Sequence, residues 1–172
     1  YMQGNKQSDA ATKAMESIFK EALRAHQRGD TASAETGYRK VLAARPEHVG
    51  ALHMLATLDI ARGDLDAAQG RLRQAIGLKP SWALHYDLGY VLDVSGQPDE
   101  AEREYRRAIE LNPQCLDAHY NLGILLKERN RPEEAVRAYR AALAIDPNHA
   151  PARNNLGLAL SAMQQPAEAA RQ

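Results

Sequence analysis

Several residues recur along this 172-residue chain at an almost constant interval. One series of prolines is separated by 34, 33 and 34 residues, at Pro46, Pro80, Pro113 and Pro147. A series of alanines keeps the same interval, at Ala34, Ala68, Ala101, Ala135 and Ala169. A unit of this length cannot bury its apolar face alone, and stacking on neighbouring units covers that face. The chain is therefore expected to form an array of similar units.

Glycine and proline divide each unit into two helices. Three glycines stand where a residue with positive φ would end a first helix, at Gly29, Gly63 and Gly96. Three prolines stand in the opening turn of the expected second helix, at Pro98, Pro132 and Pro166. Only 5% of the residues are aromatic and alanine is abundant, which favours helices packed through small residues. Each unit is thus predicted to be a helix-turn-helix.

The best copy of the repeat is LDAHYNLGILLKERNRPEEAVRAYRAALAIDP, residues 116–147. Its leucine and glycine at 122–123, with Ala135, Tyr139 and Pro147, resemble the tetratricopeptide repeat (TPR), a helix-turn-helix unit. The resemblance covers residues 15–172 and implies an all-α fold, a right-handed α-solenoid or α-α superhelix with a concave inner side. Residues 1–14 are interpreted as a tag remnant or N-terminal extension. The predicted array has four full repeats at about 15–48, 49–81, 82–115 and 116–149 and a truncated fifth at 150–172.

The fifth repeat ends at Gln172, shortly after the proline that is expected to open its second helix. Terminal repeats need a polar outer face to remain soluble. We therefore expect the chain to be a fragment of a longer protein, with possible self-association through the truncated repeat.

The first helix of each unit has two faces. With Leu116 as position 1 and about 100° per residue, positions 4, 7, 8 and 11 face the second helix, and positions 2, 5, 6, 9 and 13 lie opposite. We expect the opposite face to line a concave groove that binds a protein or peptide. The predicted peptide-binding residues are His53, Thr57, Tyr86, Asp87, Tyr90, Tyr120, Asn121, Ile124, Asn154, Asn155 and Leu158.

Asn121 and Asn155 stand at position 6 of neighbouring repeats. Asparagine is a mediocre helix former, so its place in the middle of a helix invites a functional reason. One amide can donate to a peptide carbonyl and accept from a peptide N–H, and a row of amides would hold an extended backbone. The pattern resembles the asparagine ladder of O-linked N-acetylglucosamine transferases, which holds protein substrates, although Lys20, Met54 and Asp87 do not match it. The alternative is that these amides are only solvated.

Three functions remain open. The first is a non-catalytic scaffold that binds an extended peptide or a partner helix in its groove. The second is the substrate-recruiting N-terminal region of a larger glycosyltransferase or sulfotransferase, because residues 22–56 are similar to TPR regions that bacteria fuse to such enzymes. The third is a self-stacking assembly scaffold. The chain itself is not expected to be an enzyme, whereas the activity of a full-length parent protein stays open.

A second mode of TPR recognition, the clamp that holds a C-terminal carboxylate, needs basic and amide side chains at fixed groove positions. Two starting registers place His53, Thr57, Asp87, Asp117 and Asn121, or Tyr86, Tyr90, Asn121, Pro151 and Asn155, at those positions. Neither set holds a lysine or an arginine, so we expect no capture of a C-terminal carboxylate.

Composition argues against several other partners. The 22 basic and 22 acidic residues balance, so the chain has little long-range attraction for nucleic acid. No apolar stretch approaches the about 20 residues of a membrane-spanning helix, and no membrane partner is expected. Cys115 is the single cysteine, which is interpreted as a small packing residue and fits a reducing compartment, so a cytoplasmic location is expected.

Histidines do not predict a metal site. His53, His85 and His119 come from successive repeats, whose helices stand about 8–10 Å apart, too far for shared coordination of one zinc ion. We interpret all three as surface or groove residues and expect neither a metal nor a cofactor. The charged segment at 102–107 is interpreted as solvated ion pairing, for instance between Glu102 and Arg106.

Overall fold

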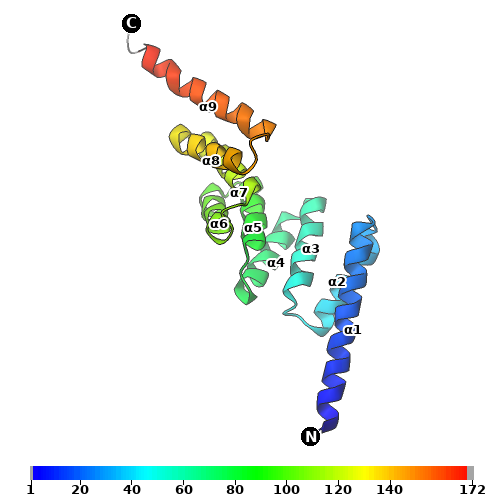
Figure 1. Ribbon diagram of the computed structural model, residues 1–172. Coiled ribbons are helices and arrows are strands. Elements are labelled where there is room, and N and C mark those ends of the chain that lie inside the picture. Colours follow the sequence, from blue (N-terminus) through cyan, green and yellow to red (C-terminus); the bar gives the residue numbers. More distant parts are fainter. Residues whose placement is uncertain (1, 170–172) are drawn as a thin grey trace. The chain divides into compact units, whose positions relative to one another are not determined.

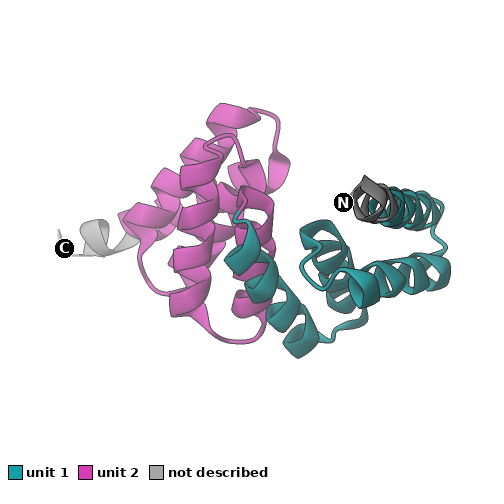
Figure 2. Ribbon diagram, turned by 90° about the horizontal axis from the view of Figure 1, so that it is seen from below, with its two compact units in different colours: residues 1–80 teal, residues 81–172 magenta. Residues whose placement is uncertain are grey.

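The structure is a computed structural model that describes the backbone of residues 2–169 and the side chains of residues 10–164. That part of the chain holds nine α-helices and no strand (Figure 1), which confirms the predicted all-α fold. The chain divides into two compact units, residues 1–80 and 81–172 (Figure 2), and each is described by itself.

Unit 1 consists of two helical hairpins, in which α1 packs on α2 and α3 packs on α4. A further contact between α2 and α3 joins the hairpins. The four helices are α1 Met2–Gln27, α2 Thr31–Ala44, α3 Val49–Arg62 and α4 Leu65–Leu78. Helix α1 begins at Met2 and therefore includes nearly all of the predicted N-terminal extension at 1–14.

Unit 2 repeats the same arrangement, with α5 on α6, α7 on α8 and a final helix, α9, on α8. Helix α7 also packs on α6 and, more lightly, on α5 and α9, so first helices of successive repeats are neighbours. The five helices are α5 Trp82–Val94, α6 Pro98–Leu111, α7 Leu116–Glu128, α8 Pro132–Ile145 and α9 Ala150–Ala169.

The turn inside each hairpin needs one residue in the left-handed region. Gly29, Gly63 and Gly96 take φ values of 80°, 78° and 73°, as predicted. In the hairpin of α7 and α8 the same role falls to Asn130, with φ of 57°. Asparagine is one of the few residues with a side chain that tolerates this conformation. Proline stands in the first turn of both α6 and α8, which confirms that part of the prediction.

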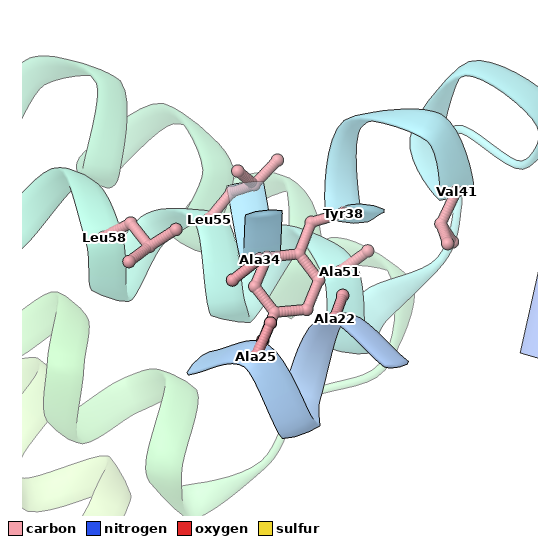
Figure 3. Packing of buried hydrophobic residues seen from close by; sticks show 8 residues of the cluster. All are labelled: Ala22, Ala25, Ala34, Tyr38, Val41, Ala51, Leu55 and Leu58. Carbon is pink, nitrogen blue, oxygen red and sulfur yellow. The ribbon is translucent and has the colours of Figure 1, made fainter. Parts of the chain in front are cut away.

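Small residues on the first helix admit a large side chain from the second. Tyr38, Tyr105 and Tyr139 are fully buried at equivalent places in three hairpins. A Cβ atom on Gly89 would lie 2.7 Å from Cδ1 of Tyr105, so glycine allows the ring to lie closer here than an alanine would without a shift. In unit 1, Ala22 has the place of that glycine, and Figure 3 shows the Tyr38 ring among alanine side chains.

Ion pairs link successive repeats within each unit. Glu35 on α2 binds Arg62 at the end of α3 through two hydrogen bonds. In unit 2 the corresponding Glu102 accepts from Arg106, as predicted, and also from Arg129 and Arg131, at 2.9, 3.2 and 2.7 Å. Partial burial of Glu102 acts to raise the pKa of its carboxyl group, but the arginines outweigh burial and lower that pKa.

The prediction that Pro166 opens a second helix in the fifth repeat is wrong. Helix α9 runs unbroken from Ala150 to Ala169 (Figure 1). The place held by Gly96 and Asn130 in earlier repeats is held here by Gln164. Glutamine resists the left-handed conformation that the turn requires, because its Cβ clashes with the backbone. The helix therefore continues where a turn was expected.

Candidate functional site

The two asparagines of the candidate site are bonded to tyrosines of the preceding repeat. Nδ2 of Asn121 donates to the hydroxyl oxygen of Tyr86 at 3.3 Å. Nδ2 of Asn155 donates to the hydroxyl oxygen of Tyr120 at 3.2 Å. In both pairs the residues are 35 positions apart, so the bonds join α5 to α7 and α7 to α9. The amides are therefore more than solvated side chains: they form part of the contact between repeats.

Each tyrosine of these pairs is held in place by aromatic neighbours. The ring centroid of Tyr86 lies 6.2 Å from that of Tyr105, and Tyr120 lies at the same distance from Tyr139. Tyr120 also meets the ring of His149 edge to face at 5.0 Å. These contacts leave each ring few alternative positions.

Tyr86 is further enclosed by a small cluster of buried side chains, Ala108, Cys115 and Ala118. Cys115 is buried, which confirms its interpretation as a packing residue, and burial raises the pKa of its thiol. Burial, supported by the negative charges of Asp117 and Asp87, raises the pKa of Tyr86 to about 12. The Tyr86 hydroxyl is therefore neutral, with its proton available for donation, at physiological pH.

Unit 1 holds an apolar version of the same pair. Phe19 and Met54 stand 35 residues apart at the equivalent positions, and both pack against the cluster around Tyr38. The ring of Phe19 lies 5.8 Å from Tyr38 and 4.6 Å from His48. The sequence held a signal for this pairing that was missed. Where unit 2 has a tyrosine and an asparagine, unit 1 has a phenylalanine and a methionine, so both positions change together.

The other predicted groove residues of unit 2 differ in how far they are exposed. Tyr90 and Leu158 are 40% and 56% exposed, Asn154 is exposed, and Asp87 and Ile124 are half-buried. Leu158 also lines a cavity of about 800 Å³ together with Ala159, Ala162 and Met163 of α9 and with residues at the turn from α7 to α8.

His53 and Thr57 lie on α3 of unit 1, where the Thr57 hydroxyl donates to the backbone oxygen of His53 at 3.1 Å. The structure therefore brings together four predicted residues, Tyr86, Asn121, Tyr120 and Asn155, as two bonded pairs. A groove shared by all eleven stays a prediction.

The interpretation of His85 as a surface or groove residue is wrong. Its side chain is buried, with only 8% of the residue exposed, and Nδ1 lies 2.6 Å from Oε2 of Glu104. The reason is its position 4, which faces the second helix of the hairpin. His119, at the same position of the next repeat, is half-buried, and its Nε2 lies 3.0 Å from the backbone oxygen of Pro113.

Within the described residues, no group of three or more histidine, cysteine, aspartate or glutamate side chains is placed to hold a metal ion. No helix in the same part of the chain is both long enough and apolar enough to cross a membrane.

Three family models for the tetratricopeptide repeat match the sequence, over residues 25–88, 86–150 and 138–172. Among curated proteins, none matches the chain. Solved structures give further matches. A MamA protein is 26% identical with a TM-score of 0.81, over 93% of this chain and 88% of MamA. YrrB, described as a TPR protein with an unusual peptide-binding site, is 24% identical with a TM-score of 0.76, over 89% of this chain and 83% of YrrB.

A third similar structure is a mutant O-GlcNAc transferase from Thermobaculum terrenum, 32% identical with a TM-score of 0.65. The match covers 77% of this chain but 26% of the transferase. The family models together extend from residue 25 to the end of the sequence, in agreement with the helical hairpins and their spacing. The chain belongs to the tetratricopeptide repeat family.

Proposed function

We propose that this chain is a non-catalytic scaffold that binds an extended peptide or a partner helix along the first helices of its repeats. The observation that carries the proposal is the pair of tyrosine–asparagine hydrogen bonds, Tyr86 with Asn121 and Tyr120 with Asn155. Two identical polar contacts at one register of successive repeats supply the regular spacing that an extended ligand requires.

Each pair offers hydrogen-bonding groups that complement a peptide unit. The tyrosine oxygen accepts from the asparagine amide, so its own O–H can donate to a peptide carbonyl. The asparagine Oδ1 can accept from a peptide N–H. The packing of Tyr120 against Tyr139 and His149 supports the proposal because a fixed donor loses little entropy on binding. Exposed apolar surface at Tyr90 and Leu158 would contact the ligand side chains.

The proposal is tested by selecting peptides from a random library on the immobilised chain and titrating them by calorimetry. Replacing both Asn121 and Asn155 by alanine should weaken binding about fivefold for each amide, near the net worth of one hydrogen bond. The control is the double change Arg137→Ala and Arg140→Ala, which alters exposed residues of the second helix α8. Equal affinities for the wild type and the asparagine variant, with both folded, would refute the proposal.

A second function is favoured by a separate observation, the 32% identity to an O-GlcNAc transferase over 77% of this chain. On this proposal the chain recruits protein substrates for a glycosyltransferase domain of a longer parent protein. The gene sequence beyond the codon for Gln172 tests it. A glycosyltransferase domain there supports the proposal, and a stop codon or an unrelated domain rejects it.

A further inference from the structure

In unit 2, position 5 of each first helix carries a side chain that can donate a hydrogen bond. Tyr86 of α5, Tyr120 of α7 and Asn154 of α9 follow one another at intervals of 34 residues, and α7 contacts both α5 and α9. Tyr86 and Tyr120 are half-buried, whereas Asn154 is exposed. Both tyrosine oxygens already accept from an asparagine amide, so their O–H groups can donate to a ligand. Unit 2 therefore offers one donor per repeat.

The spacing of these donors favours one backbone conformation of the ligand. Neighbouring packed helices stand about 8–10 Å apart, so the donors recur at about that interval. The carbonyl groups on one side of a polyproline II (PPII) helix recur every three residues, or about 9.3 Å. In a β-strand they recur every two residues, or about 6.8 Å, so a strand that meets the first donor does not meet the second. The carbonyl groups of an α-helical ligand are already bonded within the helix.

Apolar side chains stand beside these donors with the same period. Tyr90, Ile124 and Leu158 hold position 9 of the same three helices, one helical turn after the donors. Tyr90 and Leu158 are exposed, and Ile124 is half-buried. The pyrrolidine rings of a proline-rich PPII helix also recur every three residues, and grooves that recognise such ligands are lined with aromatic side chains. One ring per repeat could therefore pack on this row while a carbonyl meets each donor.

We propose that the ligand of unit 2 is a proline-rich segment of a partner protein in the PPII conformation. This inference rests on the proposed function, because it names the class of peptide that the same residues bind. Three residues of the ligand span one repeat, with a carbonyl at position 5 and a pyrrolidine ring on position 9. Proline favours this class of ligand because it holds the PPII conformation before binding, so that little backbone entropy is lost.

The test uses a fluorescent peptide with four copies of Pro-Pro-Ala, which at about 37 Å in PPII is long enough to reach all three donors. Titration with the full 172-residue chain, followed by fluorescence anisotropy, should give saturable binding. A control peptide with four copies of Gly-Gly-Ala has the same length and the same number of carbonyl groups. It should bind at least about tenfold more weakly, because a flexible chain loses more backbone entropy and has no rings for position 9.

Removal of the two hydroxyl donors tests their role. The double change Tyr86→Phe and Tyr120→Phe keeps both rings and should weaken binding of the proline peptide about fivefold for each hydrogen bond lost. Tyr38→Phe in unit 1 is the matched control, because the Tyr38 hydroxyl lies 3.2 Å from Nδ1 of His26 and its side chain is fully buried. This control should bind like the wild type. Thermal unfolding of each variant establishes that it is folded at the temperature of the titration.

Three results would overturn the PPII proposal. They are no binding of the proline peptide by the wild type, equal binding of the glycine peptide, and equal binding of the proline peptide by the folded double variant. Selection from the random library separates this inference from the proposed function. The selected peptides should carry prolines at a spacing of three residues. Selected peptides without proline whose binding depends on Asn121 and Asn155 would reject the PPII ligand and leave the scaffold function in place.

Discussion

The side-chain amide of Asn121 on α7 donates a hydrogen bond to the hydroxyl of Tyr86 on α5, 35 residues earlier. Asn155 and Tyr120 repeat the relationship one repeat later. The residues that we propose for ligand binding are thus the same residues that hold neighbouring repeats together. Binding and repeat packing are therefore expected to respond to the same substitutions.

Coupling between Asn121 and Tyr86 can be measured in a double-mutant cycle. Asn121→Ala and Tyr86→Phe should each lower the free energy of unfolding, and their coupling energy should be about 1 kcal/mol, the net value of one hydrogen bond. Urea unfolding of the two single variants and the double variant provides the measurement. Combining Asn148→Ala, an exposed change near the start of α9, with Tyr86→Phe should give no coupling. Additive effects of Asn121→Ala and Tyr86→Phe would show that the bond contributes nothing.

Gly123→Ala should lower the free energy of unfolding by about 1–3 kcal/mol. The added Cβ would lie 2.5 Å from Cε1 of Tyr139, so the fully buried ring would have to shift. Gly70→Ala is the control for helix propensity and should raise stability by up to about 1 kcal/mol, since its Cβ meets no neighbour. The two substitutions are compared by urea unfolding, and the same sign of change in both would contradict the packing described for Tyr139.

Tyr139→Phe should leave stability unchanged or raise it. The Tyr139 hydroxyl is buried and has no hydrogen-bond partner among the described residues. At the equivalent place, the hydroxyl of Tyr105 donates to Oδ2 of Asp93 at 3.4 Å. Tyr105→Phe is therefore the matched comparison and should lose about 0.5–1.5 kcal/mol. A larger loss in Tyr139→Phe than in Tyr105→Phe, measured by thermal unfolding, would disprove the difference between the two sites.

Alkaline pH should destabilise the fold through its buried tyrosines. Burial, with smaller contributions from Asp117 and Asp87, raises the pKa of Tyr86 from 10.0 to about 12. Because the folded state favours the neutral phenol, this stabilisation is complete below pH 10 and is lost as the pH rises toward 12. Between these values the free energy of unfolding should fall less steeply in Tyr86→Phe than in the wild type. Tyr90→Phe, at an exposed position, is the control, and an identical slope in Tyr86→Phe and the wild type would count against the burial of Tyr86.

Repeat spacing made the helical hairpins predictable, because glycine and proline have backbone requirements that few other residues share. Asn130 was missed in the fourth turn because asparagine takes left-handed conformations only in some contexts. Pro166 was misinterpreted because a proline in a first turn marks a helix start only when a turn precedes it, and Gln164 does not favour one.

The composition of the candidate site was predictable in part. Periodicity assigns Tyr120 and Asn155 to the face opposite the second helix, but it does not show that the two bond to each other across repeats. That contact depends on how closely α7 and α9 approach, which is set by the packing of both on α8. Periodicity also assigns position 4, and so His85, to the face toward the second helix, but it does not show that His85 pairs with Glu104 there.

The proposed function is tested most directly by nuclear magnetic resonance of the chain with a library-selected peptide. The side-chain amide signals of Asn121 and Asn155 and the ring signals of Tyr86 and Tyr120 should shift more than any others as peptide is added. Shifts confined to the exposed side of α6 and α8, with those amide signals unmoved, would contradict the account.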